Sequence, residues 1–414
     1  MSGNEALARG AWEAGVRVAS AYPGTPSTEI LEELARLPGI DARWAPNEKV
    51  AFDVAAGAYM AGARALVSMK HVGLNVASDS LMTVSYTGGK GALVVVTCDD
   101  PEMHSSQNEQ DNRLYAPLAG VPLLEPGDSQ EARDFALEAF RISAAHDTPV
   151  LLRLTTRISH TKGPVCLGER EEVLPSGFER DPEKYVMIPA YARKRHPVVV
   201  ERLELLKGEA ERSPLNRVER GEKGLGIITS GIAYHYVKEV LPRASLLKLG
   251  FTFPLPEKLI RDFAGRVGRL LVVEELEPFL EGAISALGLR VEGKALFPRC
   301  GELSAEKLRE GLSVAGLLPH QEEPPEPSHA VTPRPPVLCP GCSHRGLFAA
   351  LRRVKPIVAG DIGCYTLSVL PPLSIHDTCT CMGASIGTAL GLERAGGEKR
   401  PIVAVIGDST FLHS

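Results

Sequence analysis

Short apolar runs alternate with helical segments along most of this sequence, and this alternation limits its fold more than any other feature. In the first 162 residues, strand-like runs lie at 16–22, 65–69, 92–97, 122–125 and 149–154, and helical patterns lie at 3–13, 27–37, 48–63 and 129–145. Strands that alternate with helices form parallel sheets with helices on both faces. The sequence therefore predicts an α/β protein built on parallel sheets.

The length of 414 residues predicts more than one domain, since a domain typically holds ~150 residues. A charged stretch at 163–223, with a helix expected from Pro197 to about Glu211, predicts a connecting arm. A second α/β block follows at 224–318. Seven prolines at 319–336 predict a linker, and a third block occupies 337–414. In the second block, strands are expected at 226–229, 245–249 and 269–273, and helices at 232–240 and 256–263.

Composition excludes several classes of function. No run of ~18 apolar residues occurs, so the sequence offers no candidate membrane-spanning helix. A net charge of −5 and an aromatic content of 5% give neither a basic field nor a stacking platform for nucleic acid. Residues 1–5 lack the basic and apolar blocks of a signal peptide, which predicts a cytoplasmic location.

The sequence stops at Ser414, directly after a strand-like run and a Gly-Asp-Ser turn. A βα unit is only half formed at that point. We therefore expect a chain that is truncated at its carboxyl end.

Thr25 and Pro26 follow the first strand pattern and a Pro-Gly turn, and they precede a helical pattern. Thr at the cap and Pro at the first helical position are favoured because the first amides of a helix lack internal partners. Such a helix start at the carboxyl end of a strand can bind an anion. A well-capped helix without a ligand explains the same residues.

Glu48 opens the next helical pattern, whose following turns are rich in Ala and Gly. The helix dipole favours a carboxylate in the first turn, so helix electrostatics alone can explain this residue. The functional alternative is a buried acid that protonates a cofactor nitrogen.

Five of the eight cysteines lie between Cys339 and Cys381, so sulfur chemistry is expected to be local. The turn from Cys339 to Cys342 directs two thiolates to one point, as in zinc, iron–sulfur and redox sites. A structural zinc site from Cys339, Cys342, Cys379 and Cys381 is one alternative. A thiol pair that only packs is another.

Two further segments of the third block have features of a phosphate site. Gly383, Ala384 and Ser385 open a helical pattern rich in small residues, where backbone amides can approach an anion. Asp408 follows a buried strand pattern, at the position where open α/β sheets bind ligands. An Asp beside a phosphate is a natural magnesium ligand, and a turn-capping Asp is the alternative.

Together these segments resemble the thiamine-diphosphate-dependent 2-oxoacid:ferredoxin oxidoreductases. Gly407-Asp408-Ser409 resembles their diphosphate-binding half, and Glu48 resembles the carboxylate of their pyrimidine-binding half. The segments most similar to the alpha subunit of the indolepyruvate type are YPGTPS at 22–27, MKHVGLNV at 69–76, VEELEP at 273–278, CPGC at 339–342 and GDIGCYTL at 360–367. The resemblance implies a pyrimidine-binding domain at 1–162, a transketolase-C-like middle domain at 224–318 and an incomplete diphosphate-binding domain at 337–414.

The resemblance also implies an activity, which is oxidative decarboxylation of aryl pyruvates to acyl-coenzyme A with electrons passed to ferredoxin. Glu48 would hydrogen-bond the aminopyrimidine ring of thiamine diphosphate, and Thr25 would hold the substrate carboxylate. His71 and Arg113 would line the substrate pocket, unless either is a packing or surface residue. Asp408 would bind Mg²⁺. The residues implied in cofactor binding are Cys342, His344, Gly363, Cys364, Gly383, Ala384, Ser385, Gly407, Asp408 and Ser409.

Iron–sulfur clusters and partners follow from the same resemblance. Cys339, Cys342 and Cys364 resemble positions that bind a cluster in two-subunit relatives. 4Fe–4S clusters and a second magnesium ligand are expected beyond Ser414, and a beta subunit, ferredoxin and coenzyme A are the expected partners. Two alternatives stay open, namely a non-oxidative thiamine-diphosphate 2-oxoacid decarboxylase and an inactive fragment or assembly module.

Overall fold

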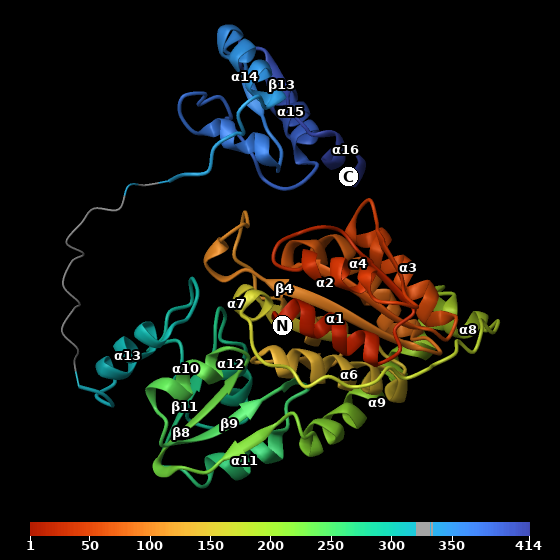
Figure 1. Ribbon diagram of the computed structural model, residues 1–414, viewed down its shortest axis with the longest axis vertical. Helices are drawn as coiled ribbons and strands as arrows, with labels where there is room; N and C mark the ends of the chain where they lie inside the picture. The colour runs from red at the N-terminus through yellow and green to blue at the C-terminus, as the bar shows by residue number, and fades with distance from the viewer. Residues whose placement is uncertain (320–331, 333) are drawn as a thin grey trace. The chain divides into compact units, whose positions relative to one another are not determined.

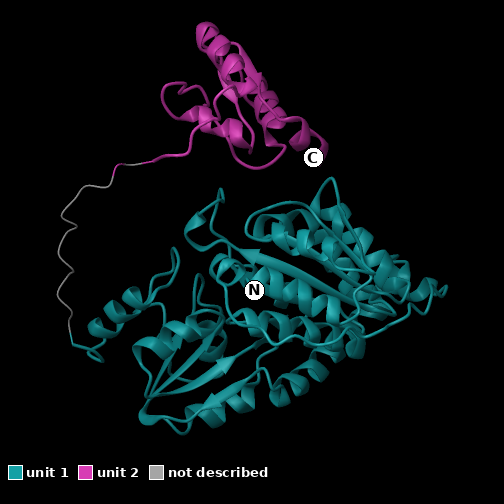
Figure 2. Ribbon diagram, viewed as in Figure 1, with its two compact units in different colours: residues 1–321 teal, residues 322–414 magenta. Residues whose placement is uncertain are grey.

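The computed structural model describes residues 1–319, 332 and 334–414, and the chain divides into two compact units, 1–321 and 322–414 (Figures 1 and 2). Most of the predicted linker at 319–336 lies outside the described residues. The domain boundaries predicted within residues 1–318 stay predictions, because both α/β blocks belong to the first unit.

Unit 1 contains a seven-stranded sheet with the strand order β10-β5-β6-β4-β3-β1-β2. Every neighbouring pair is parallel except β10 and β5. The strands are β1 (Val18–Ala21), β2 (Asp41–Trp44), β3 (Arg64–Lys70), β4 (Ala92–Asp99), β5 (Leu123–Leu124), β6 (Val150–Thr155) and β10 (Phe251–Phe253).

Helices cover both faces of this sheet, because successive residues of the central strand β4 point to opposite cores. Val94 and Val96 pack with α1, α2 and α6, whereas Leu93 and Val95 pack with α3, α4 and α5. The helices and 3₁₀ turns are α1 (Gly3–Glu13), α2 (Thr28–Arg36), α3 (Glu48–Met60), α4 (His71–Thr87), η1 (Pro101–Met103), η2 (Asn112–Leu114), α5 (Tyr115–Ala119), α6 (Ser129–His146) and α7 (Thr156–His160).

A second sheet of unit 1 has the order β11-β8-β9-β7, in which β7 alone is antiparallel to its neighbour. Helices α10 and α13 pack on one face, and α11 and α12 pack on the other. The elements are β7 (Arg217–Glu219), β8 (Glu222–Ser230), α10 (Ala233–Val240), β9 (Ala244–Leu249), α11 (Glu257–Ala264), β11 (Arg269–Val273), α12 (Phe279–Ala286) and α13 (Ala305–Val314).

The arm that connects the two sheets differs from its prediction. After the short helix α8 (Pro182–Tyr185), helix α9 spans Pro189–Arg212, with Pro197 inside it. The predicted start at Pro197 is therefore wrong. Proline is favoured at the first helical position because its missing N–H has no partner there in any case, and Pro189 occupies that position. Strand β7 and the beginning of β8 also lie in the predicted arm.

Unit 2 has a two-stranded parallel sheet of β12 (Ile357–Ala359) and β13 (Ile402–Ala404). Its core includes Phe348, Val358 and Tyr365. The helices are α14 (Ser343–Val354), η3 (Cys364–Val369), α15 (Ala384–Ala395) and α16 (Asp408–His413). The predicted α/β class with mostly parallel sheets is confirmed, and the antiparallel strands β7 and β10 lie at sheet edges. None of the helices in the described residues has the length and apolar character needed to cross a membrane.

Candidate active site

Glu48 is the first residue of α3, as predicted, because Asn47 caps the helix by accepting a hydrogen bond from the amide of Val50 at 2.8 Å. Parallel strands direct the following helices so that α3 and α4 both begin at the carboxyl edge of the sheet, where open α/β sheets bind ligands. Glu48 is only 5% exposed, and its side chain lies against Gly73 in the first turn of α4. The structure therefore places a buried carboxylate at the ligand-binding edge.

Thr25 does not cap a helix, so that prediction is wrong. Helix α2 begins at Thr28, because Ser27 and Thr28 close a turn onto Gly24. The hydroxyl of Ser27 donates to the carbonyl of Gly24 at 2.8 Å, and the amide of Gly24 donates to the hydroxyl of Thr28 at 3.0 Å. Thr25 is left exposed at the tip of this turn.

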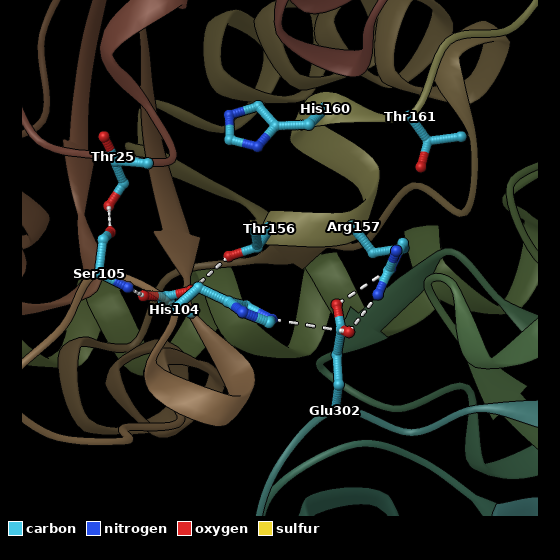
Figure 3. A pocket seen from close by; sticks show the side chains of 9 residues that line it. Thr25, His104, Ser105, Thr156, Arg157, His160, Thr161 and Glu302 are labelled. Atoms are coloured by element: carbon cyan, nitrogen blue, oxygen red, sulfur yellow. Dashed lines mark hydrogen bonds and ion pairs between the residues drawn. The ribbon is translucent and has the colours of Figure 1, made fainter. Parts of the chain in front are cut away.

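Thr25 lines a cavity of about 480 Å³ beside the ends of β4 and β6 (Figure 3). That volume lies within the range of ligand pockets. Side chains from both blocks of unit 1 meet in it, since Glu302 comes from the segment before α13. The lining residues are Thr25, Asp100, His104, Ser105, Thr156, Arg157, His160, Thr161 and Glu302.

The Glu302 carboxylate holds two side chains of this cavity in place. Arg157 forms a two-point ion pair with the Glu302 carboxylate, and His104 Nε2 lies 3.6 Å from the same carboxylate (Figure 3). Lys70 is not a lining residue, but its Nζ donates to the carbonyl of the lining residue Ser105 at 2.6 Å, and burial lowers the pKa of Lys70. The cavity thus combines hydroxyl groups with the Arg157 guanidinium, and the carboxylates of Asp100 and Glu302 line it as well.

His71 is the first residue of α4 and is fully buried. Its Nε2 lies 3.1 Å from the side-chain oxygen of Asn108, and its Nδ1 has no hydrogen-bond partner in the described structure. Burial lowers its pKa, which favours the neutral ring. His71 does not line the cavity around Thr25.

Arg113 is also fully buried, and its guanidinium is occupied by protein groups. It donates to Asp111 at 2.6 Å and to Glu274 at 2.7 Å, and it reaches the backbone carbonyls of Glu275 and Glu277. This geometry favours the packing interpretation of Arg113 that the sequence left open.

In unit 2, Tyr365 contacts both the helix start after Cys342 and the Gly-Asp-Ser turn. The sulfur of Cys342 lies 3.3 Å from His344 Nδ1, and the ring of His344 lies 5.3 Å from that of Tyr365. The Tyr365 hydroxyl in turn accepts a hydrogen bond from the amide of Gly407 at 3.1 Å. Four of the predicted cofactor residues, Cys342, His344, Gly363 and Cys364, therefore belong to the segments joined to Gly407 through Tyr365.

The turn at the start of α15 already holds a carboxylate. Asp361 is fully buried and accepts hydrogen bonds from the amides of Gly383 at 2.8 Å and Ser385 at 2.9 Å. The amide of Ala384 donates to the carbonyl of Cys381. These three amides are thus occupied in this conformation, whereas the buried hydroxyl of Ser385 has no partner in the described structure.

No described group of three or more His, Cys, Asp or Glu side chains is arranged to hold a metal ion. Neither the three-cysteine cluster nor the four-cysteine zinc site is therefore assembled in residues 334–414, and all five cysteines there are free. Asp408 and Ser409 are exposed at the start of α16, so Asp408 offers a single carboxylate to Mg²⁺.

Several residues that shape these regions were missing from the sequence prediction. Glu302 carries no local pattern, and Lys70 lies in the segment at 69–76 without an assigned role, because both act through contacts with distant segments. Asp361 lies in a sequence pattern that could have identified it as a candidate site residue. It follows an apolar run and a glycine, which is the pattern that singled out Asp408.

The chain is similar to known proteins along its whole length. Residues 9–207 match the family described as "Pyruvate flavodoxin/ferredoxin oxidoreductase, thiamine diP-bdg", and residues 361–414 match "Thiamine pyrophosphate enzyme, C-terminal TPP binding domain". The chain is 44% identical to the indolepyruvate oxidoreductase subunit IorA of Pyrococcus horikoshii and 46% identical to that of Methanothermobacter thermautotrophicus. Each alignment covers 100% of this chain, and 70% and 71% of the respective relative.

Among solved structures, the 2-oxoglutarate:ferredoxin oxidoreductase of Magnetococcus marinus is similar with a TM-score of 0.60 and 18% identity. The match covers 74% of this chain and 63% of that chain, and it shows a common fold. Identity above 40% along the whole chain is the stronger finding. Together with the two family matches, it shows that the chain belongs to the thiamine-diphosphate-dependent 2-oxoacid:ferredoxin oxidoreductase family.

Proposed function

We propose that this chain is the catalytic subunit of an indolepyruvate-type oxidoreductase, which converts an aryl pyruvate and coenzyme A to acyl-coenzyme A and carbon dioxide. Two electrons pass singly to ferredoxin, and a beta subunit completes the enzyme. The observation that carries the proposal is the buried carboxylate of Glu48 at the carboxyl edge of the parallel sheet, in a chain similar throughout to IorA subunits.

Thiamine diphosphate, when bound, supplies a nucleophilic ring carbon and an electron sink for the decarboxylation. Glu48 would hold a proton between its carboxylate and a nitrogen of the pyrimidine ring. A carboxyl group removed from water is suited to this task, because water does not compete for the proton.

Thr25 would donate its hydroxyl to the carboxylate of the oxo acid in the 480 Å³ cavity. Arg157, which Glu302 holds in place, adds its guanidinium to the same cavity. We place the diphosphate of the cofactor on unit 2, near Cys342, His344, Gly363, Cys364, Ser385, Gly407 and Ser409, with Asp408 as a ligand of Mg²⁺. The 4Fe–4S clusters and the cytoplasmic location stay predictions from the sequence.

The test uses the assembled oxidoreductase with indolepyruvate, coenzyme A and an oxidised viologen dye as electron acceptor. Wild-type enzyme should reduce the dye, and E48Q should lower kcat by at least about 100-fold, the usual range for loss of a general acid–base group. E32Q is the control, because Glu32 is an exposed carboxylate on α2 rather than on the helix of Glu48. Aldehyde that accumulates while the dye stays oxidised would instead identify a non-oxidative decarboxylase.

A further inference from the structure

Glu48 and Gly73 meet where two neighbouring helices begin. Glu48 is the first residue of α3, Gly73 is the third residue of α4, and both are buried. A β-carbon placed on Gly73 would lie 2.5 Å from Glu48 Oε1, 2.6 Å from Cγ and 2.8 Å from Cδ. Such contacts are well inside van der Waals distance. The Glu48 side chain therefore occupies the space that any side chain at position 73 would need.

Helices α3 and α4 cannot easily move apart to make room for a side chain at position 73. Lys49 Nζ donates to Ser80 Oγ at 3.1 Å, and Ser80 Oγ donates to Asp53 Oδ1 at 2.6 Å, so polar contacts join α3 to α4 just beyond Glu48. The apolar contact between these helices is close-packed as well, through small buried residues such as Ala55 and Ala77. A methyl group at position 73 would thus displace the Glu48 side chain rather than the backbone.

Glycine is otherwise a poor choice at this position. It weakens a helix relative to alanine, and Gly73 does not adopt the left-handed conformation that favours glycine elsewhere in the chain. Gly57 in α3 provides the contrast, because a β-carbon there would meet no atom within 4 Å. Contact with Glu48 is the specific feature that separates the two positions.

We propose that Gly73 is a positioning residue for Glu48, whose carboxylate it seats on the first turn of α4. This inference rests on the proposed role of Glu48 toward the pyrimidine ring. Gly73 contributes no group of its own to the chemistry. It acts by leaving space, so that the carboxylate lies in one position before the cofactor arrives.

The test measures cofactor affinity in the assembled apo-oxidoreductase by titration calorimetry. The two probes are thiamine diphosphate and an analogue in which carbon replaces the ring nitrogen proposed to meet Glu48. Wild-type protein should bind the natural cofactor at least about tenfold more tightly, and E48A should lose this preference. G73A should lose it too, while G57A should keep it.

Each outcome has a separate meaning. If wild-type protein binds both probes equally, the proposed role of Glu48 fails, and the inference about Gly73 fails with it. If wild-type protein and G73A both prefer the natural cofactor over the analogue by the same factor, only the inference about Gly73 is overturned.

The double variant E48A/G73A keeps the test decisive if G73A alone does not assemble. Removal of the Glu48 side chain leaves room for the methyl group, so E48A should restore the melting temperature and assembly of G73A. In activity assays, G73A should lower kcat at least about tenfold in the wild-type background and have no further effect in the E48A background. Failure of E48A to rescue G73A, or equal effects of G73A in both backgrounds, would contradict the proposal.

Discussion

At the scale of single residues, burial determines how His71 responds to pH. Burial lowers the pKa of His71 in the folded protein below the ordinary value of about 6.5. As pH falls below 6.5, the unfolded chain gains a proton that the folded protein does not yet bind, so the stability of the fold decreases. This loss stops once the pH has passed below the folded-state pKa.

We therefore predict that this residue contributes a stability slope of up to about 1.4 kcal/mol per pH unit below pH 6.5. H71Q should remove that contribution, because glutamine does not titrate. Urea unfolding between pH 5 and pH 8 measures the slope, and H160Q serves as control at an exposed histidine. An identical slope for H71Q and wild-type protein would show that His71 does not contribute.

Residue positions were easier to predict than residue surroundings. The place of Glu48 at the start of a helix follows from its own neighbours in sequence, since Asn47 is a good cap. The buried ion pair of Arg113 cannot be predicted from its neighbours in sequence, because its partner Glu274 lies 161 positions away. A sequence pattern read over one or two turns of helix carries no information on such a contact.

At the scale of elements, Asp361 connects the end of β12 to the start of α15. Both of its carboxylate oxygens accept amide hydrogen bonds from the turn at Gly383 and Ser385. In D361N, one carboxylate oxygen becomes an NH₂ group, which faces an amide donor and leaves it without an acceptor. We predict a loss of about 1–3 kcal/mol in the stability of unit 2.

Hydrogen exchange at residues 383–385 and urea unfolding check this prediction. E393Q is a suitable control, because Glu393 is exposed on the same helix. Equal exchange rates at 383–385 in D361N and wild-type protein would rule out the role assigned to Asp361.

Helix starts illustrate what local pattern can predict for an element. The start of α3 was predicted, whereas α2 begins three residues after Thr25 and α9 begins at Pro189 rather than Pro197. In both failures more than one residue of suitable type is available for the same role. Thr25 competes with Ser27 and Thr28, which close a local turn onto Gly24, and Pro197 competes with Pro189.

At the scale of the whole molecule, the two sheets of unit 1 are joined by buried charges. Arg113 and Glu274 are each 1% exposed at their side chains, and Lys248 of β9 reaches Glu131 of α6. Breaking a buried pair leaves an uncompensated charge, which costs far more than the loss of a surface pair. We expect these contacts to make residues 1–318 unfold as one cooperative body.

E274A should therefore destabilise unit 1 by about 3–5 kcal/mol and reduce the exchange protection of β4 and β11 together. E239Q removes an exposed ion pair with Arg309 and should cost less than about 1 kcal/mol. If E274A reduces exchange protection in β11 while β4 stays fully protected, the two sheets unfold independently. That result would contradict the prediction of one cooperative body.

The α/β class and most strands of both sheets were predictable, because buried parallel strands are continuous apolar runs. Strand β10 was not, because it has three residues and pairs with a strand more than a hundred residues earlier. Neither its length nor its position in the chain distinguishes it from a loop.

Strand β10 also has a consequence for biosynthesis. It supplies the edge partner of β5, whose Leu123 and Leu124 are fully buried in the finished fold. A ribosome that adds 5–20 residues per second needs on the order of ten seconds to proceed from β5 to β10. During that interval the nascent chain exposes an apolar sheet edge, which is the kind of surface that chaperones protect from aggregation.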